Sequence, residues 1–304
     1  MSVQSGNSGE GGRDMDTTEQ TQDAGWRGLV AKASLALSIF TVFWFVAAAL
    51  GTKLGLWGWQ FGLGTMTINW GLKLIFLALG VSVIALVLSL IKAPRKRAFI
   101  LSFAALLISG LCFGRVAAFG GQATRLPPIH DVQTDWTNPI MPSEALLAAR
   151  EKTGAMNPVM EAPVVPEYAE ERWPGTPGRL VSELQEEAEF DPAVQEDRVD
   201  APYPKLDSYI TNAPPATAHE AILDIVKERG WAVVEDDAAQ GVIEATETSF
   251  WFDFKDDVMI RILPTEEGGS RIDVRSTSRV GLSDLGANAK RVRDLLDDIE
   301  TALR

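Results

Sequence analysis

The residues of this chain that could do chemistry gather near its carboxyl end, and the first group is a set of arginines. Residues 258–263 and 271–279 alternate apolar and polar side chains, as β-strands do when successive side chains point to opposite faces. One face would then carry apolar and small residues, namely Val258, Ile260, Ile262, Ile272, Val274, Ser276 and Ser278. The other would carry Asp273 and four arginines, Arg261, Arg271, Arg275 and Arg279. Guanidinium groups bind carboxylates and phosphates, so this face predicts either cross-strand ion pairs or a site for an anion or lipid headgroup.

A second group of polar residues lies in SRVGLSDLGANAKR, residues 278–291. Ser283 and Asp284 stand where a helix is predicted to begin, and there they can cap its N–H groups and match its dipole. Asn288 and Arg291 follow on a polar face of the same helix. We therefore expect either a helix cap or a cradle for an anion at this helix start.

The third group is WFDFKDD, residues 251–257. Alternation predicts that three neighbouring aromatic rings enter the core, those of Phe250, Phe252 and Phe254. Trp251 would line the mouth of a groove together with Asp256 and Asp257. The same carboxylates support an alternative function, a metal-assisted hydrolase that uses Asp256, Asp257 or His130.

The spacings of known catalytic and metal-binding motifs do not occur in the sequence, which has no HExxH, GxSxG, Walker or CxxC pattern. His130 and His219 are the only histidines, and Cys112 is the only cysteine, so an intrachain disulfide is excluded. His130 next to Asp131 offers fewer ligands than a protein metal site uses. We therefore predict no catalytic residue, no metal ligand and no cofactor, and we favour a binding role over an enzyme.

The elements that position these groups follow from hydrophobic periodicity. Apolar residues at helical spacing predict a helix that starts with a capping box at Thr217 and Glu220 and ends before Gly230. Four strands are predicted next, at residues 231–235, 241–248, 258–263 and 271–279. A last helix would begin near Ser283 and bury Leu285, Ala289, Val292, Leu296, Ile299 and Leu303. This order predicts an α+β fold in which an antiparallel sheet packs with helices in two layers.

Three apolar runs precede this domain, at residues 29–50, 72–91 and 98–119. At about 1.5 Å of rise per residue, each matches a hydrocarbon core of about 30 Å, so we predict three transmembrane helices. Tryptophans flank the runs as an aromatic belt would, at Trp26, Trp57, Trp59 and Trp70. We expect the glycine-rich linker of residues 51–71 to lie along the membrane interface.

Basic residues predict the orientation of these spans. Lys92, Arg95, Lys96 and Arg97 lie between the second and third runs, whereas the first linker carries only Lys53. Because basic loops stay in the cytoplasm, we expect a cytoplasmic amino terminus and an extracytoplasmic domain after residue 119.

Composition divides the chain into four parts. Residues 1–24 are polar and predict a disordered tail, and residues 25–120 form the membrane anchor. Residues 121–213 form an irregular arm, rich in proline and acidic residues, and residues 214–304 form the α+β core. Within the arm we expect an edge strand at 132–136 and short helices at 143–151 and 180–189, the first of them capped by Ser143.

The soluble part is strongly acidic. Residues 121–304 hold thirty-six Asp and Glu against eighteen Lys and Arg. Phosphate backbones require a cationic surface, so we exclude nucleic acid as a partner. The acidic run at 183–200 is predicted to be a solvated face, with a cation site as the alternative.

Residues 126–304 contain several separated motifs in a fixed order, namely PPIHDVQTDWTNP, YPKLDSY, GWAVVEDD, GVIEATETSFWFDFKDDVMIRI and RSTSRVGLSDLGANAKR. Together they resemble the domain of unknown function 1499 family. The resemblance implies a membrane-associated or exported protein of bacteria or plastids, and it implies no enzyme activity, cofactor or site residues. The chain departs from the family pattern by a long acidic insertion at residues 139–201.

These observations together predict a multi-pass protein of the bacterial inner membrane with a periplasmic α+β domain in the cell envelope. The domain is predicted to bind a partner protein or an anionic, lipid-like ligand. The candidate ligand-binding residues are Trp251, Asp256, Asp257, Arg261, Arg275, Arg279, Ser283, Asp284, Asn288 and Arg291.

Overall fold

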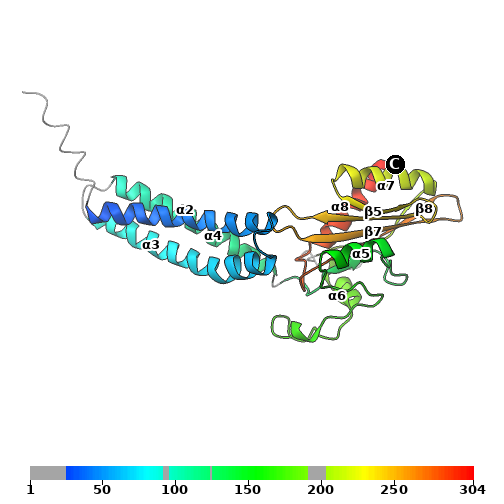
Figure 1. Cartoon of the computed structure of the whole chain (residues 1–304), viewed down its shortest axis with the longest axis horizontal. Coiled ribbons are helices and arrows are strands. Elements are labelled where there is room, and N and C mark those ends of the chain that lie inside the picture. Colours follow the sequence, from blue (N-terminus) through cyan, green and yellow to red (C-terminus); the bar gives the residue numbers. More distant parts are fainter. Residues whose placement is uncertain (1–24, 92–95, 124, 191–202) are drawn as a thin grey trace, which may run out of the picture. The chain divides into compact units, whose positions relative to one another are not determined.

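The computed structural model describes residues 25–91, 96–123, 125–190 and 203–304, which form two compact units, 1–117 and 118–304 (Figure 1). The predicted tail at 1–24, the loop residues Lys92 and Arg95, and most of the acidic run lie outside the described residues. Each unit is considered separately below.

The first unit consists of long apolar helices, as predicted. Helix α2 spans Trp26–Lys53, α3 spans Leu72–Ile91 and α4, which continues into the second unit, spans Lys96–Ala123. All three are long and apolar enough to cross a membrane. Small residues allow α2 and α3 to approach closely, and the hydroxyl oxygens of Ser38 and Ser82 lie 3.4 Å apart between them.

The linker prediction is wrong for residues 60–71. A π-helical segment, η2 (Gln60–Gly71), runs directly into α3 and packs against α2. Gly62 makes this contact possible, because a Cβ atom there would lie 2.0 Å from Oγ1 of Thr52. The indole N–H of Trp44 donates to the carbonyl of Met66 at 2.8 Å and fixes the same interface.

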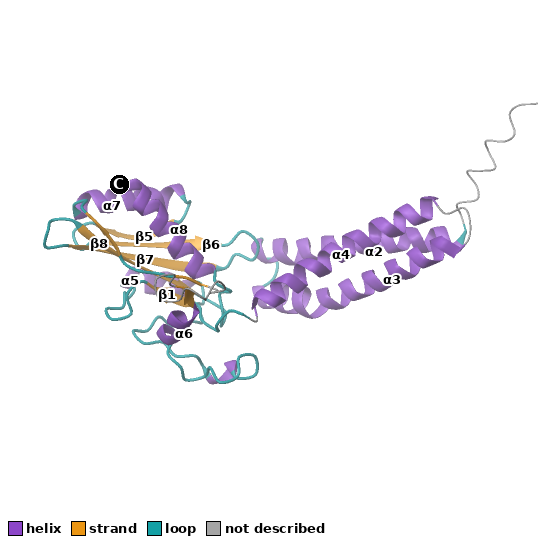
Figure 2. Ribbon diagram, turned by 180° about the vertical axis from the view of Figure 1, so that it is seen from behind, coloured by secondary structure: helices purple, strands orange, loops and turns teal. Residues whose placement is uncertain are grey.

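The second unit is built on an antiparallel sheet that confirms the predicted strands (Figure 2). Strands β5 (Ala232–Asp237), β6 (Val242–Thr248), β7 (Lys255–Pro264) and β8 (Ser270–Ser278) form a meander. In the described part of the chain, β1 (Asp131–Gln133) and β4 (Tyr209–Thr211) both add to the outer side of β8, so that the arm supplies two strands to this sheet.

Helices cover both faces of the sheet, so the described domain has three layers rather than the predicted two (Figures 1 and 2). Helices α7 (Pro215–Glu228) and α8 (Ala287–Ala302) cover the apolar face and enclose the main core. Helix α5 (Glu144–Lys152) lies on the arginine-bearing face, where Ile140, Leu146 and Met259 form a smaller core. The remaining elements of the arm are η3 (Glu167–Ala169), α6 (Val181–Ala188) and a short parallel pair, β2 (Glu189–Phe190) with β3 (Tyr203–Pro204).

Helix α6 also closes the outer edge of β1. The side chain of Gln185 accepts the backbone N–H of Gln133 at 3.1 Å and donates to its carbonyl at 2.9 Å. It also accepts the indole N–H of Trp136 at 2.9 Å and donates to the carboxyl of Glu189 at 2.6 Å. One amide therefore pairs with the strand as a neighbouring backbone would.

Local signals predicted some helix ends and failed at others. Ser143 caps α5 as predicted, because its hydroxyl accepts the N–H of Leu146 at 3.1 Å. Gly230 follows α7 with a φ of 72°, a left-handed conformation that suits glycine. The predicted capping box is wrong, since α7 begins at Pro215 and no side chain caps it. Helix α8 begins at Ala287, later than the predicted start near Ser283.

Candidate functional site

The register of β7 and β8 confirms the predicted alternation. Arg261 lies opposite Asp273, Arg275 opposite Met259 and Arg271 opposite Leu263, all on the face that α5 covers. The candidate arginines therefore do share a face of the sheet. Each of them meets a carboxylate there, and together they form the arginine network described below.

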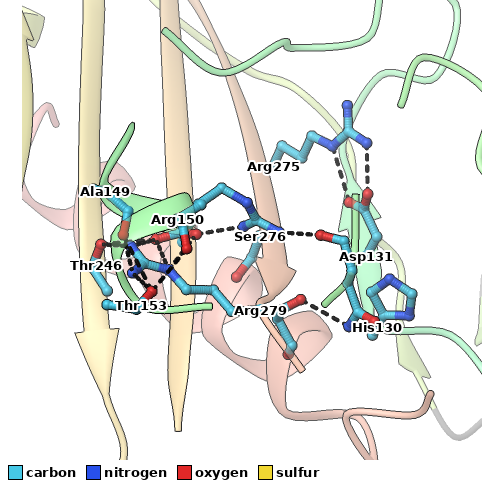
Figure 3. A network of polar contacts seen from close by, with 12 residues as sticks. His130, Asp131, Ala149, Arg150, Thr153, Thr246, Arg275, Ser276 and Arg279 are labelled. Atoms are coloured by element: carbon cyan, nitrogen blue, oxygen red, sulfur yellow. Dashed lines mark hydrogen bonds and ion pairs between the residues drawn. The ribbon is translucent and has the colours of Figure 1, made fainter. Parts of the chain in front are cut away.

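Arg275 and Asp131 form the innermost pair of this network (Figure 3). Nε and Nη2 of Arg275 donate to the two carboxylate oxygens at 2.9 and 2.6 Å, and neither residue is exposed to solvent. The same guanidinium donates to the carbonyls of Ile140 at 2.7 Å and Met160 at 2.8 Å. Arg275 thus ties the edge strand β1 and two points of the arm to the centre of the sheet.

Asp257 binds two guanidinium groups at once. Arg279 donates to both of its oxygens, through Nε at 2.9 Å and Nη2 at 2.7 Å, and Arg150 of α5 donates to Oδ2. Thr246 donates to Oδ1 at 2.8 Å. Burial lowers the pKa of the Arg150 guanidinium, against the opposing effect of Asp257. All four side chains are buried, so the group fastens α5 to the sheet.

The remaining arginines of the network lie at its more open end. Asp273 accepts from Nη2 of Arg261 at 2.7 Å and from Nε of Arg271 at 3.0 Å. Arg271 also pairs with Asp135 and keeps 37% of its side chain exposed. Burial raises the pKa of Asp135, but hydrogen bonds from Thr137 and Arg271 outweigh it and bring that pKa to about 2.

The second predicted cluster forms a clamp on the segment that leads into the domain. The N–H of Asp284 donates to the carbonyl of Ile129 at 3.0 Å, and the hydroxyl of Ser283 donates to the carbonyl of Pro127 at 3.1 Å. Asn288 donates to the carbonyl of His130 at 2.9 Å. These contacts hold residues 127–130 against the start of α8.

Asp284 acts as the predicted cap, although α8 starts three residues after it. Its two oxygens accept the N–H groups of Gly286 and Asn288, each at 2.8 Å. Burial raises the pKa of Asp284 to about 6 despite these hydrogen bonds. Asn288 is buried between the helix and β8, where it also bonds Ser276 and Ser278, so it does not face solvent.

Asp256 and Asp257 point to opposite faces of β7, so the structure does not bring them to one groove. Asp256 pairs with Arg291 of α8 at 2.6 Å, and Arg291 also contacts Glu247. Asp257 lies on the α5 side, where Arg150 and Arg279 occupy its oxygens. Adjacent strand residues diverge in this way because of the pleat.

The WFDFKDD segment begins as a hairpin tip rather than a strand. In this tip, residues 249–254, the N–H of Ser249 donates to the carbonyl of Phe254 at 2.8 Å, and Ser249 Oγ accepts the N–H of Phe254 at 2.9 Å. The predicted core position of Phe250 is wrong, since 65% of it is exposed, and Trp251 is 52% exposed. Phe252 is only partly buried and stacks on Phe254.

Sequence reasoning missed the carboxylates and the arginine that the arm contributes. Asp131 directly precedes the predicted edge strand at 132–136, and β1 in fact begins at Asp131, but nothing near Arg150 indicates its partner. Glu244 was also missed: it is buried, accepts from Ser143 N–H at 2.8 Å, and burial raises its pKa. His130 and Asp131 do not form a joint site, because Arg275 holds both oxygens of Asp131.

Part of the chain is similar to a protein family of unknown function. No curated protein matches the chain. Residues 171–299 match the family model described as "Protein of unknown function (DUF1499)", a narrower range than the predicted 126–304. The match includes α7, the meander β5 to β8 and α8 as far as Ile299, but not β1 or α5. Over residues 171–299 the chain is thus similar to the DUF1499 family, and this region follows three helices that are long and apolar enough to cross a membrane.

Proposed function

We propose that this chain is a membrane-anchored binding protein whose soluble domain recognises a partner protein and catalyses no reaction. In this proposal the protein resides in the inner membrane of a bacterium, with its amino terminus in the cytoplasm and its domain in the periplasm. The basic residues at the start of α4, Lys96 and Arg97, support that orientation by the positive-inside rule.

One surface of the domain carries the proposal. Trp136, Met141 and Met160 surround Arg275, and we name this group the apolar collar. The sulfur of Met141 lies 3.8 Å from Nη1 of Arg275, and the Trp136 ring centroid lies 5.5 Å from its guanidinium carbon. Met141 is 43% exposed and Met160 is 39% exposed. Tryptophan, methionine and arginine are enriched in protein interfaces, and methionine adapts to the shape of its partner.

The collar is preorganised by the buried pair beneath it. Arg275 donates to the carbonyls of Ile140 and Met160, while Asp131 fixes the guanidinium from the opposite side. The backbone on both flanks of the collar is therefore fixed before any partner arrives. Fixing it in advance reduces the ordering entropy that binding would otherwise cost.

The described contacts argue against the hydrolase alternative. Both oxygens of Asp257 accept hydrogen bonds from arginines, and Asp256 pairs with Arg291 on the other face of β7. A hydrolase would need these carboxylates to exchange guanidinium partners for a metal ion or a water molecule. Their present contacts instead hold α5 and α8 against the sheet.

Affinity purification of the full-length protein from detergent-solubilised host membranes tests the proposal. The variant Met141→Ser/Met160→Ser is expected to lose a co-purifying protein that the wild type retains. Tyr168→Ser, at an exposed residue of η3, is the matched control and should retain it. Lipid analysis of the same samples tests the alternative that the domain binds an anionic lipid instead of a partner protein. If Arg261→Gln/Arg271→Gln loses a bound lipid while the collar variant loses nothing, the ligand is the lipid and the collar assignment is wrong.

A further inference from the structure

The hairpin tip between β6 and β7 presents two large aromatic side chains to solvent. Phe250 and Trp251 are 65% and 52% exposed, and their rings meet edge to face with centroids 5.0 Å apart. Leaving apolar surface of this size in water costs free energy, which burial would recover at roughly 25 cal/mol per Å². Such a pair at the end of a hairpin suggests a surface that becomes covered.

The tip is a built loop rather than a frayed strand end. Besides the two Ser249–Phe254 hydrogen bonds, Phe252 and Phe254 stack with centroids 5.8 Å apart. Asp253 adopts a left-handed φ of 57° and pairs with Lys255 at 3.3 Å. These contacts fix the turn that projects Phe250 and Trp251, so little ordering would be needed when the tip is covered.

The tip also lies at the end of the domain where the chain enters it. Asp256, at the start of β7, pairs with Ser278, and the N–H of Ser278 donates to the carbonyl of His130 at 2.8 Å. Leu126 is buried in the core of the domain, and helix α4 ends at Ala123. Three residues extend at most about 10 Å, so the connection from the apolar helix to this end of the domain is short.

We propose that Phe250 and Trp251 insert into the headgroup region of the bilayer that the chain's own helices cross. Tryptophan favours this region because its ring is apolar and its N–H can still reach water or a headgroup. The occupant of the tip is thus the lipid surface, which holds the domain in one orientation. This inference rests on the membrane anchoring in the proposed function, and it is independent of the apolar collar.

Fluorescence quenching in lipid nanodiscs tests the insertion with the full-length chain. In a Cys112→Ser background, an environment-sensitive dye is attached to Trp251→Cys and, as the control, to Glu267→Cys in the turn between β7 and β8. Lipids with a shallow spin label should remove most of the emission at position 251 and leave position 267 bright. Equal quenching at the two positions, or none at 251, overturns the proposal.

Two further measurements keep the outcomes separate. Native Cys112 of α4, labelled in the wild-type chain, should be quenched by a deep spin label. If it is not, the membrane anchoring itself fails; if it is quenched while position 251 is not, only the insertion fails. A dye on Phe250→Cys should lose its shallow quenching when Trp251→Glu is added, because a buried carboxylate is costly at the interface. Retained quenching in that variant would also contradict insertion.

Discussion

Arg275 and Asp131, which are 144 residues apart in the sequence, form a two-point ion pair that is completely buried. Removing one partner would leave an uncompensated charge in the interior, which typically costs about 3–5 kcal/mol. We therefore expect Arg275→Met and Asp131→Leu to lower the free energy of unfolding by that amount each, measured by pulse proteolysis in urea. The double variant removes both charges and should recover most of the loss. Single variants that each cost under about 1 kcal/mol would show that water reaches the pair.

Asp257→Asn provides the second prediction. The amide would place a donor against Arg150 or Arg279 and leave two buried guanidinium groups without a carboxylate, so a loss of about 3–5 kcal/mol is expected. Asp253→Asn is the matched control. Asp253 forms an exposed pair with Lys255 and has a positive φ that asparagine tolerates, so its loss should stay below about 1 kcal/mol. If the two variants are equally stable, the Asp257 carboxylate is not needed to hold the two arginines. It would then be available for a role in catalysis.

Stability should fall as the pH rises from acidic to neutral. Burial raises the pKa of Glu189 from 4.5 to about 7 and that of Asp284 from 3.8 to about 6. Because the folded state favours the protonated forms, their contribution is complete below the unfolded pKa values and is lost as the pH passes through about 6 and 7. Glu189→Gln should flatten the upper part of a plot of thermal midpoint against pH. Glu186→Gln, at an exposed neighbour, should leave the plot unchanged; if both variants match the wild type, Glu189 is ionised in the fold.

Gln185→Glu should destabilise the outer edge of the sheet. The substitution replaces a donor by an acceptor that faces the carbonyl of Gln133 and the carboxyl of Glu189. A buried acceptor that has lost its hydrogen-bond donor costs about 1–3 kcal/mol of stability. Urea unfolding should show that loss, whereas Gln240→Glu, in an exposed turn, should change stability by less than about 0.5 kcal/mol. A loss in both variants alike would indicate a general effect of added negative charge.

The fold was largely predictable because its periodic signals are local. Alternation in residues 258–263 and 271–279 assigned the apolar side chains and the arginines of these residues to the correct faces of β7 and β8. Alternation misled at Phe250, Phe252 and Phe254, which were expected to enter the core, because the Ser249 hydrogen bonds close a turn at these residues. A pattern of two residues per repeat cannot distinguish a strand from a short aromatic turn.

The site was less predictable because its partners are distant in the sequence. The sequence left two alternatives for Arg279, a cross-strand ion pair or an external anion, and it did not name the partner. Its carboxylate is Asp257 of the same sheet, and its neighbour is Arg150 of the arm. The chain carries so many acidic residues that no single one could be chosen as a partner. Only the fold, which lays α5 over the sheet, selects Asp257.

The clamp on residues 127–130 has a mechanical consequence. A force on the helices is transmitted to the domain through Leu126. The hydrogen bonds of Ser283, Asp284 and Asn288 to residues 127–130 are the first contacts to resist it. Behind them β1 lies antiparallel to β8 and is bonded to it by the sheet. The contacts of Ser283, Asp284 and Asn288 must therefore break before a force that enters through Leu126 can begin to detach β1.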